Sequence, residues 1–196
     1  MSNSSLLRIF VGIAALLGGA CAGDIADTPE GQLEDSSDAL KQRLPEIPEG
    51  LAVPAGHKLA FTLDAEGVQI YDCKTNAAGA AVWTFRAPDA ELFSRRRFAG
   101  THYAGPTWEA LDGSTVVGAR VAGVTVDSSA IPWLLLSGVS PDARGRMAGV
   151  TYIHRLETVG GLAPSSGCDA TTLGDVAEVE YSALYAFYKQ RGCGPR

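Results

Sequence analysis

The chain has 196 residues, 46% of them hydrophobic and 19% charged, with a formal net charge of −6. That length and composition suffice for one globular domain with a substantial core. Residues 24–50 carry a net charge of −6 and residues 51–196 a net charge of −1, so the globular part has no basic excess and nucleic acid is excluded as an expected partner. The 23 glycines and two methionines favour turn-rich β structure over helices.

Residues 1–21 have the pattern of a signal peptide with a lipobox-like end. The apolar stretch 9–17 is too short to span a bilayer, and small residues follow it. In a lipobox the cysteine, here Cys21, receives a lipid and becomes the new N-terminus, although Gly18 stands where a large aliphatic residue is usual. Soluble export after cleavage at residues 20–22, or an uncleaved anchor, are the alternatives. We expect export, with the protein either held at a cell-envelope membrane through Cys21 or secreted.

An acidic, disordered linker is predicted over residues 22–50. This stretch contains prolines and few aromatic residues, and its charge is strongly negative, as in extended tethers. A single all-β domain is expected to follow over residues 51–196.

From residue 51 onward, hydrophobic side chains recur at every second position, as they do in half-buried strands. One strand is expected around residues 58–63, followed by a turn at 64–67 and a second strand that begins at Val68. Turn-forming residues at 76–79 predict a hairpin between that strand and the segment AVWTF.

Further strands are predicted in the segments TWEAL, DGSTVVGARVAGVTV, AIPWLLLSGVS and GVTYIHRLETVGG. Helical alternatives remain for residues 86–100 and 182–189. The whole pattern predicts an all-β, mainly antiparallel domain, either a β-sandwich or an open barrel, with at most short helices.

The stretch GTHYAGPTWEALDGS (residues 100–114) contains most of the candidates for a binding site. His102, Tyr103, Trp108 and Glu109 combine an imidazole, two aromatic rings and a carboxylate. Such a set suits a saccharide or another small planar molecule that stacks on a ring beside polar groups.

Strand alternation limits which of these side chains can meet. Gly-Pro and Asp-Gly turns bracket TWEAL as a short strand, so Trp108 and Glu109 project to opposite faces. We therefore expect His102 to share a pocket with Glu109 or with Trp108, but not with both.

A further candidate, His154, lies on an apolar strand face with Tyr152 and Leu156, where a buried, hydrogen-bonded histidine is expected. With His102 it forms a weak candidate pair for a metal, because the two are far apart in sequence and no local ligand spacing accompanies them.

No motif in the chain indicates a specific reaction. It has neither a GxSxG nucleophile elbow nor a GxGxxG dinucleotide motif, so no cofactor is expected. The main hypothesis is a non-catalytic module that binds a ligand or partner in the cell envelope. The alternative is an envelope enzyme, a metal-assisted or carboxylate hydrolase, that uses His102 and Glu109.

Arg95, Arg96 and Arg97 form the one basic run of the chain. A solvated turn or edge that discourages pairing between sheets is the expected role. An anion site is the alternative.

In an exported protein, cysteines are disulfide candidates. With Cys21 set aside, Cys73, Cys168 and Cys193 allow three single bridges and leave one thiol over. Cys193 lies near the C-terminus and is expected to be the free thiol. A bridge between Cys73 and Cys168 would stabilise the fold by about 4–5 kcal/mol in the chain-entropy model.

Several motifs resemble, in the same order, the exported bacterial and fungal family described as domain of unknown function 3455: EGVQIYDC, HYAGPTWEALDGSTVVG, AIPWLLL, VTYIHRLETVGGLAPSSGC and YSALYAFYK. The resemblance covers residues 53–189. It implies a single export-associated domain, with Cys73 and Cys168 at the family's two cysteine positions, and it assigns no catalytic residue.

Overall fold

The computed structural model describes residues 44–191. Within them the chain forms eight strands and one short 3-10 helix, which confirms the all-β prediction. The elements are η1 (Glu49–Leu51), β1 (His57–Thr75), β2 (Ala81–Ser94), β3 (Arg97–Tyr103), β4 (Thr107–Ala110), β5 (Thr115–Val124), β6 (Trp133–Val139), β7 (Val150–Gly160) and β8 (Val176–Gln190). The expected signal peptide with Cys21, the linker residues up to 43 and Cys193 lie outside the described residues.

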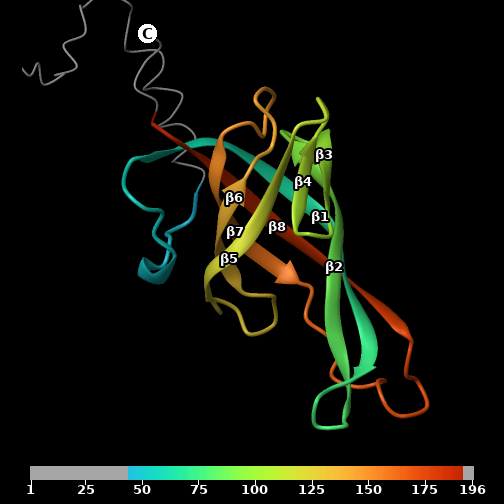
Figure 1. Ribbon diagram of the computed structural model, residues 1–196. Coiled ribbons are helices and arrows are strands. Elements are labelled where there is room, and N and C mark those ends of the chain that lie inside the picture. Colours follow the sequence, from blue (N-terminus) through green and yellow to red (C-terminus); the bar gives the residue numbers. More distant parts are fainter. Residues whose placement is uncertain (1–43, 192–196) are drawn as a thin grey trace, which may run out of the picture. The chain divides into compact units, whose positions relative to one another are not determined.

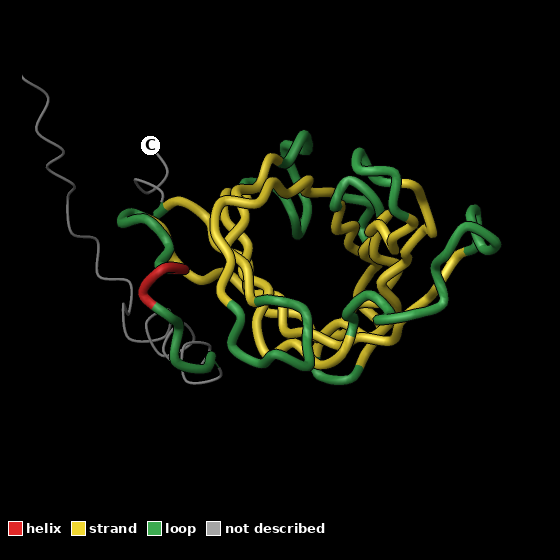
Figure 2. The backbone as a smooth tube through the Cα atoms, turned by 90° about the horizontal axis from the view of Figure 1, so that it is seen from below, coloured by secondary structure: helices red, strands yellow, loops and turns green. Residues whose placement is uncertain are grey.

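Each strand pairs antiparallel with the next one in sequence, and β8 pairs with β1, so the single sheet closes into a barrel. Figure 1 shows the strands side by side, and Figure 2 shows them as a ring when seen from below. The interior of an eight-stranded barrel is just wide enough to be filled by side chains or to hold one small ligand. The sequence predicted a mainly antiparallel sheet and left open whether it forms a sandwich or an open barrel. The structure has one sheet, and it is closed.

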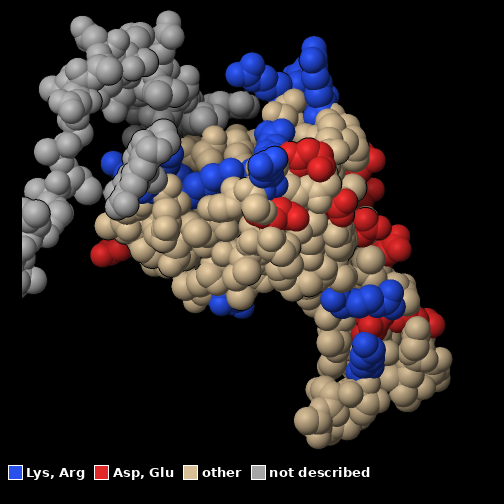
Figure 3. Space-filling model, turned by 45° about the horizontal axis from the view of Figure 1, so that its top comes forward, with Lys and Arg blue, Asp and Glu red and all other residues tan. Residues whose placement is uncertain are grey.

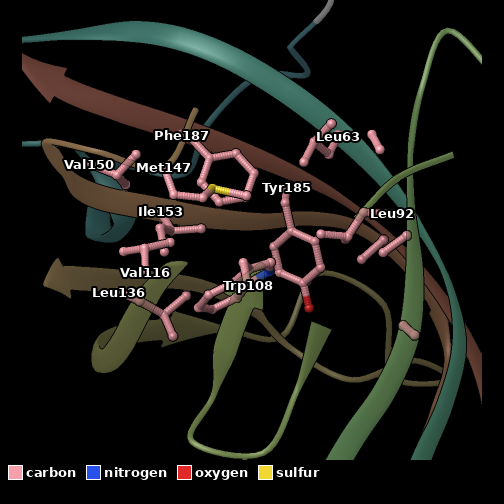
Figure 4. Close-up of a cluster of buried hydrophobic side chains, with 14 of the residues drawn as sticks. Leu63, Leu92, Trp108, Val116, Leu136, Met147, Val150, Ile153, Tyr185 and Phe187 are labelled. Carbon is pink, nitrogen blue, oxygen red and sulfur yellow. The ribbon is translucent and has the colours of Figure 1, made fainter. Parts of the chain in front are cut away.

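Inward-facing side chains fill most of the barrel (Figure 4). The largest are Trp108 of β4 and Tyr185 and Phe187 of β8, all almost inaccessible to solvent. The ring centroids of Trp108 and Tyr185 lie 5.2 Å apart in an edge-to-face contact, a favourable geometry for aromatic pairs. Smaller apolar side chains pack around them, among them Leu63, Leu92, Val116, Leu136, Met147, Val150 and Ile153.

The predicted turn at residues 64–67 is wrong, because β1 runs without a break from His57 to Thr75. Gly67 has a different role in this strand. A Cβ atom at that position would lie 2.2 Å from the backbone oxygen of Asp89, so only glycine lets β1 and β2 approach each other this closely.

The helical alternative for residues 86–100 is also wrong. There β2 continues to Ser94, and a two-residue turn leads into β3. Arg95 and Arg96 occupy this turn with φ angles of 50° and 65°, which a tight hairpin turn of this kind requires at both central positions. Their side chains are exposed, in agreement with a solvated turn.

Residues 182–189 likewise belong to a strand, β8. In the part of the chain that the structure describes, no helix has the length and apolar character needed to cross a membrane.

A second apolar cluster lies on the outer face of the barrel wall. Side chains of β8 alternate, so that Leu184 and Tyr188 point away from the interior that Tyr185 and Phe187 fill. The segment that precedes β1 packs against this outer cluster through Leu44, Ile47 and Val53. Part of the sequence assigned to the linker by its composition thus packs on the domain.

β1, β2 and the first part of β8 continue beyond the barrel as a three-stranded extension, at the lower right of Figure 1. The predicted hairpin turn at residues 76–79 is confirmed at its tip, where the backbone N–H of Asn76 donates to the carbonyl oxygen of Ala80 at 2.8 Å. The side-chain oxygen of Asn76 also accepts from two backbone N–H groups of the turn.

The loop of residues 161–175 lies against this extension. The indole N–H of Trp83 donates to the carbonyl oxygen of Ser166 at 2.9 Å. A disulfide joins Cys73 of β1 to Cys168 of the loop, with the two Cα atoms 5.4 Å apart. This is one of the three bridges that the cysteine count allowed.

Candidate functional site

A cavity of about 610 Å³ lies in the end of the barrel that carries the β3–β4 turn and the loop before β6, the lower end in Figure 1. This volume is within the range of small-molecule sites. Most of the wall is apolar, with Tyr71, Phe85, Ile131 and Leu134 among the residues that form it. The polar side chains that reach the cavity come from Gln69, His102 and Arg155, with Arg86 and Arg120 at its exposed rim.

Arg155 places a cation inside the barrel. It lies on the inward face of β7, opposite Leu134 of β6 and Tyr185 of β8. Its Nε and Nη2 atoms donate to the carbonyl oxygen of Pro132 at 3.1 and 2.9 Å. Burial lowers the pKa of Arg155 from its ordinary value, but guanidinium groups keep their charge in proteins. Among residues 44–191 no carboxylate forms a salt bridge with it.

Two buried hydrogen-bond donors lie beside Arg155, in the side chains of Gln69 and Tyr181. Gln69 is only 2% exposed, and its amide nitrogen has no acceptor within the described part of the chain. The hydroxyl of Tyr181 forms no well-aligned hydrogen bond within the described residues either, but the side chains of Tyr185 and Gln69 lie close enough to pair with it. Burial raises the pKa of Tyr181 well above its usual range, so the hydroxyl keeps its proton. A buried donor that lacks an acceptor is costly and calls for an explanation.

His102 forms part of the cavity wall and of the aromatic core at once. Its Nδ1–H donates to the carbonyl oxygen of Thr107 at 2.8 Å, and its ring stacks on Trp108 with centroids 4.2 Å apart. Burial lowers the pKa of His102 to about 3. The imidazole is therefore neutral at physiological pH.

The neutral His102 makes the stability of the protein dependent on acid pH. In the unfolded chain its pKa returns to about 6.5, so between about pH 6.5 and pH 3 only the unfolded state binds the proton. The free energy of unfolding should fall by about 1.4 kcal/mol for each unit that the pH is lowered in this window, or by about 2 kcal/mol from pH 6.5 to pH 5. Burial also lowers the pKa of His154, which adds a change of the same sign.

Urea unfolding at pH 7 and pH 5 measures this effect. A His102→Gln variant does not titrate and keeps an N–H donor for the Thr107 carbonyl. The free energy of unfolding of this variant should depend less steeply on pH than that of the wild type, and the difference should correspond to one proton. Equal pH dependence in the wild type and the variant would contradict a neutral, buried His102.

Tyr103 and Glu109 lie on the other side of the barrel wall. The Tyr103 hydroxyl donates to the Glu109 carboxylate at 2.9 Å in an exposed pair. Trp108 is 1% exposed and belongs to the core. The structure therefore pairs His102 with Trp108, separates both from Glu109, and does not form the His102–Glu109 pair that the enzyme hypothesis used.

His154 is buried outside the barrel, under the N-terminal segment. One ring nitrogen lies 3.1 Å from the Tyr188 hydroxyl, and the other donates to the carbonyl oxygen of Leu51 at 2.7 Å. His102 and His154 thus point to opposite faces of the sheet and do not meet as a metal pair. Residues 44–191 contain no cluster of three or more His, Cys, Asp or Glu side chains that could hold a metal ion.

A hollow of about 820 Å³ at the opposite end of the barrel contains Arg95, Arg97 and Arg146. Asp64 and Asp112 line it too, and the backbone N–H of Arg146 donates to the Asp112 carboxylate at 2.7 Å. Figure 3 shows basic and acidic side chains next to one another at this end. More than half of the residues that line this hollow are polar or charged, whereas the wall of the lower cavity is mostly apolar, as in small-molecule sites. The lower cavity is therefore the better candidate site for a small organic molecule.

Gln69 and Arg155 were not among the candidates predicted from the sequence. The available signal was their place in the strand pattern, since each is a polar residue on a face that its strand also uses for apolar side chains. Arg155 shares its face with Ile153, which is completely buried in the core.

Comparison with known proteins identifies a family for this barrel. A model of the family described as Protein of unknown function (DUF3455) matches residues 54–189. No curated protein and no solved structure matches the chain. The matched residues include all eight strands, almost to the end of β8, together with the lower cavity and both bridged cysteines. The chain therefore belongs to the DUF3455 family.

Proposed function

We propose that the protein is an exported, non-catalytic binding protein of the cell envelope that holds a small organic molecule in the lower cavity. The observation that carries this proposal is a cavity of about 610 Å³ with mostly apolar walls and a few converging polar side chains, the usual make-up of a small-molecule site. The lining residues come from β1, β2, β3, β5, β6, β7 and the loops at this end, and the closed sheet holds these strands in place. The pattern of residues 1–21 supports export, and a lipid on Cys21 would keep the protein at a membrane.

The positions of the polar side chains favour binding over catalysis. The enzyme hypothesis required His102 and Glu109 to reach the same substrate as general acid and base, whereas the two side chains lie on opposite sides of the wall. Trp108 is enclosed in the core and offers no open ring face for a saccharide. We therefore place the binding site in the lower cavity and not in the stretch 100–114, where the sequence predicted it.

Filling the cavity tests the proposal. The probe is N-phenylnaphthylamine, an uncharged aromatic amine whose fluorescence rises in apolar surroundings. The wild-type chain should bind it saturably, at one site. A Leu134→Trp variant, which adds a large ring to the cavity wall, should weaken binding about tenfold or more. Val139→Trp, at an exposed position of the same strand, is the matched control and should bind like the wild type.

The melting temperature of each variant shows whether it is folded. If folded Leu134→Trp protein binds the probe as tightly as the wild type, or if the wild type does not bind it at all, the cavity is not a small-molecule site.

A further inference from the structure

The charged side chains that line the lower cavity are all arginines: Arg86, Arg120 and Arg155. Gln69, which also lines the cavity, has a buried amide nitrogen, Nε2, with no partner within residues 44–191. Protein interiors avoid unpaired donors. A ligand that enters this end of the barrel therefore finds an unpaired amide donor beside the guanidinium groups.

Arg155 carries one of these guanidinium groups. Its two hydrogen bonds to Pro132 use only part of the five N–H groups of a guanidinium. Burial lowers the pKa of Arg155, and its near titratable neighbours are the side chains of Tyr185, Tyr181 and Tyr71. None of the carboxylates in residues 44–191 forms a salt bridge with it. A partly buried cation without a counter-ion in the protein is unfavourable, and an anion brought by a ligand would relieve this cost.

The rim of the cavity has the same sign of charge. Arg86 is paired with Asp72, but Asp72 also pairs with Lys74, so two cations share one carboxylate. Arg120 lines the cavity and forms no salt bridge with any described residue. Positive charge at the entrance and inside the cavity attracts anions and raises their association rate.

We propose that the ligand of this cavity is an amphipathic organic anion, a carboxylate or sulfonate on an apolar body, with its charged group bound by Arg155. A guanidinium suits such groups because its planar fork can donate two parallel hydrogen bonds to their oxygen atoms. The apolar body lies against Leu134, Ile131 and Phe85. This assignment rests on the proposed function, since it specifies what the same cavity binds.

Two probes that differ only in charge test the assignment with the full-length chain. Anilinonaphthalene sulfonate has the ring system of N-phenylnaphthylamine and an added sulfonate. The wild type should bind the sulfonate about tenfold more tightly than the neutral amine. Arg155→Gln should remove this preference, so that the sulfonate binds no more tightly than the neutral amine. Arg97→Gln, in the hollow at the other end, should keep the preference.

Arg155→Lys separates a loss of charge from a loss of fold. It keeps the cation without the planar fork, so it should remain folded and retain part of the preference for the sulfonate. Dodecanoate should displace the sulfonate probe from the wild type, whereas dodecanol, which has the same chain without the charge, should not.

The possible failures are distinguishable. If both probes bind with equal affinity, and Arg155→Gln changes neither, the cavity binds small molecules but the anion assignment is wrong. Displacement by dodecanoate and dodecanol alike has the same meaning. If neither probe binds the wild type, the proposed function fails together with the assignment.

Discussion

Replacement of Trp108 by alanine is expected to lower the free energy of unfolding by about 3–5 kcal/mol, the range for large aromatic residues removed from a core. The indole is 1% exposed and contacts His102, Tyr185 and Phe187. A Cβ atom at Gly118 would lie 2.8 Å from its ring, so the surrounding packing is tight. Urea unfolding at neutral pH measures the loss. Any effect of this variant on binding would therefore come through the fold.

Two further variants complete this experiment. Trp108→Phe keeps an aromatic ring and removes the indole N–H that has no acceptor in the described chain, so it should cost only about 1 kcal/mol. Leu111→Ala, at a side chain 68% exposed, should change stability by less than about 0.5 kcal/mol. A loss below about 1 kcal/mol for Trp108→Ala would show that the ring is not part of a packed core.

Removal of the disulfide is expected to have an effect of similar size. Cys73 and Cys168 are 95 residues apart in sequence, and the loop they close includes β2 to β7. In the chain-entropy model, opening so long a loop gives the unfolded chain enough freedom to destabilise the fold by about 4–5 kcal/mol. Urea unfolding of the Cys73→Ser, Cys168→Ser double variant against the wild type measures this difference.

The same pair of proteins should be compared in a Cys193→Ser background, which removes exchange with a third thiol. Cys193→Ser alone is expected to leave stability unchanged. If the double variant lost less than about 1 kcal/mol, the bridge would constrain only the extension and not the unfolded chain as a whole.

Local patterns in the sequence were sufficient for most of the fold. Alternating hydrophobicity predicted the strands, and turn residues predicted the hairpin at 76–79 and the short strand TWEAL, because both signals act between residues close in the chain. The turn expected at 64–67 failed for the opposite reason. Gly67 is required by the backbone of β2, which is a tertiary contact that no local pattern contains.

The candidate site was less accessible to prediction. Alternation correctly separated Trp108 from Glu109, but it left open which face of each strand points into the barrel. On β7, the face with His154 and Leu156 has the apolar character of a core face, yet the segment before β1 covers it from outside. The opposite face, with Arg155, lines the cavity. When the outer face of a barrel strand is also buried, the hydrophobic pattern does not show which face points into the barrel.

The pairing of β1 with β8 also decides the order in which the chain can fold. All other neighbours in the barrel are consecutive strands, whose contacts can form earlier because they are closer in sequence. β1 is synthesised first and its second partner, β8, last, so one edge of a 19-residue strand stays unpaired until residues 176–190 emerge. Such an edge can pair with other chains and start aggregation. A nascent or truncated chain that ends before β8 therefore has the open sheet that the finished barrel avoids.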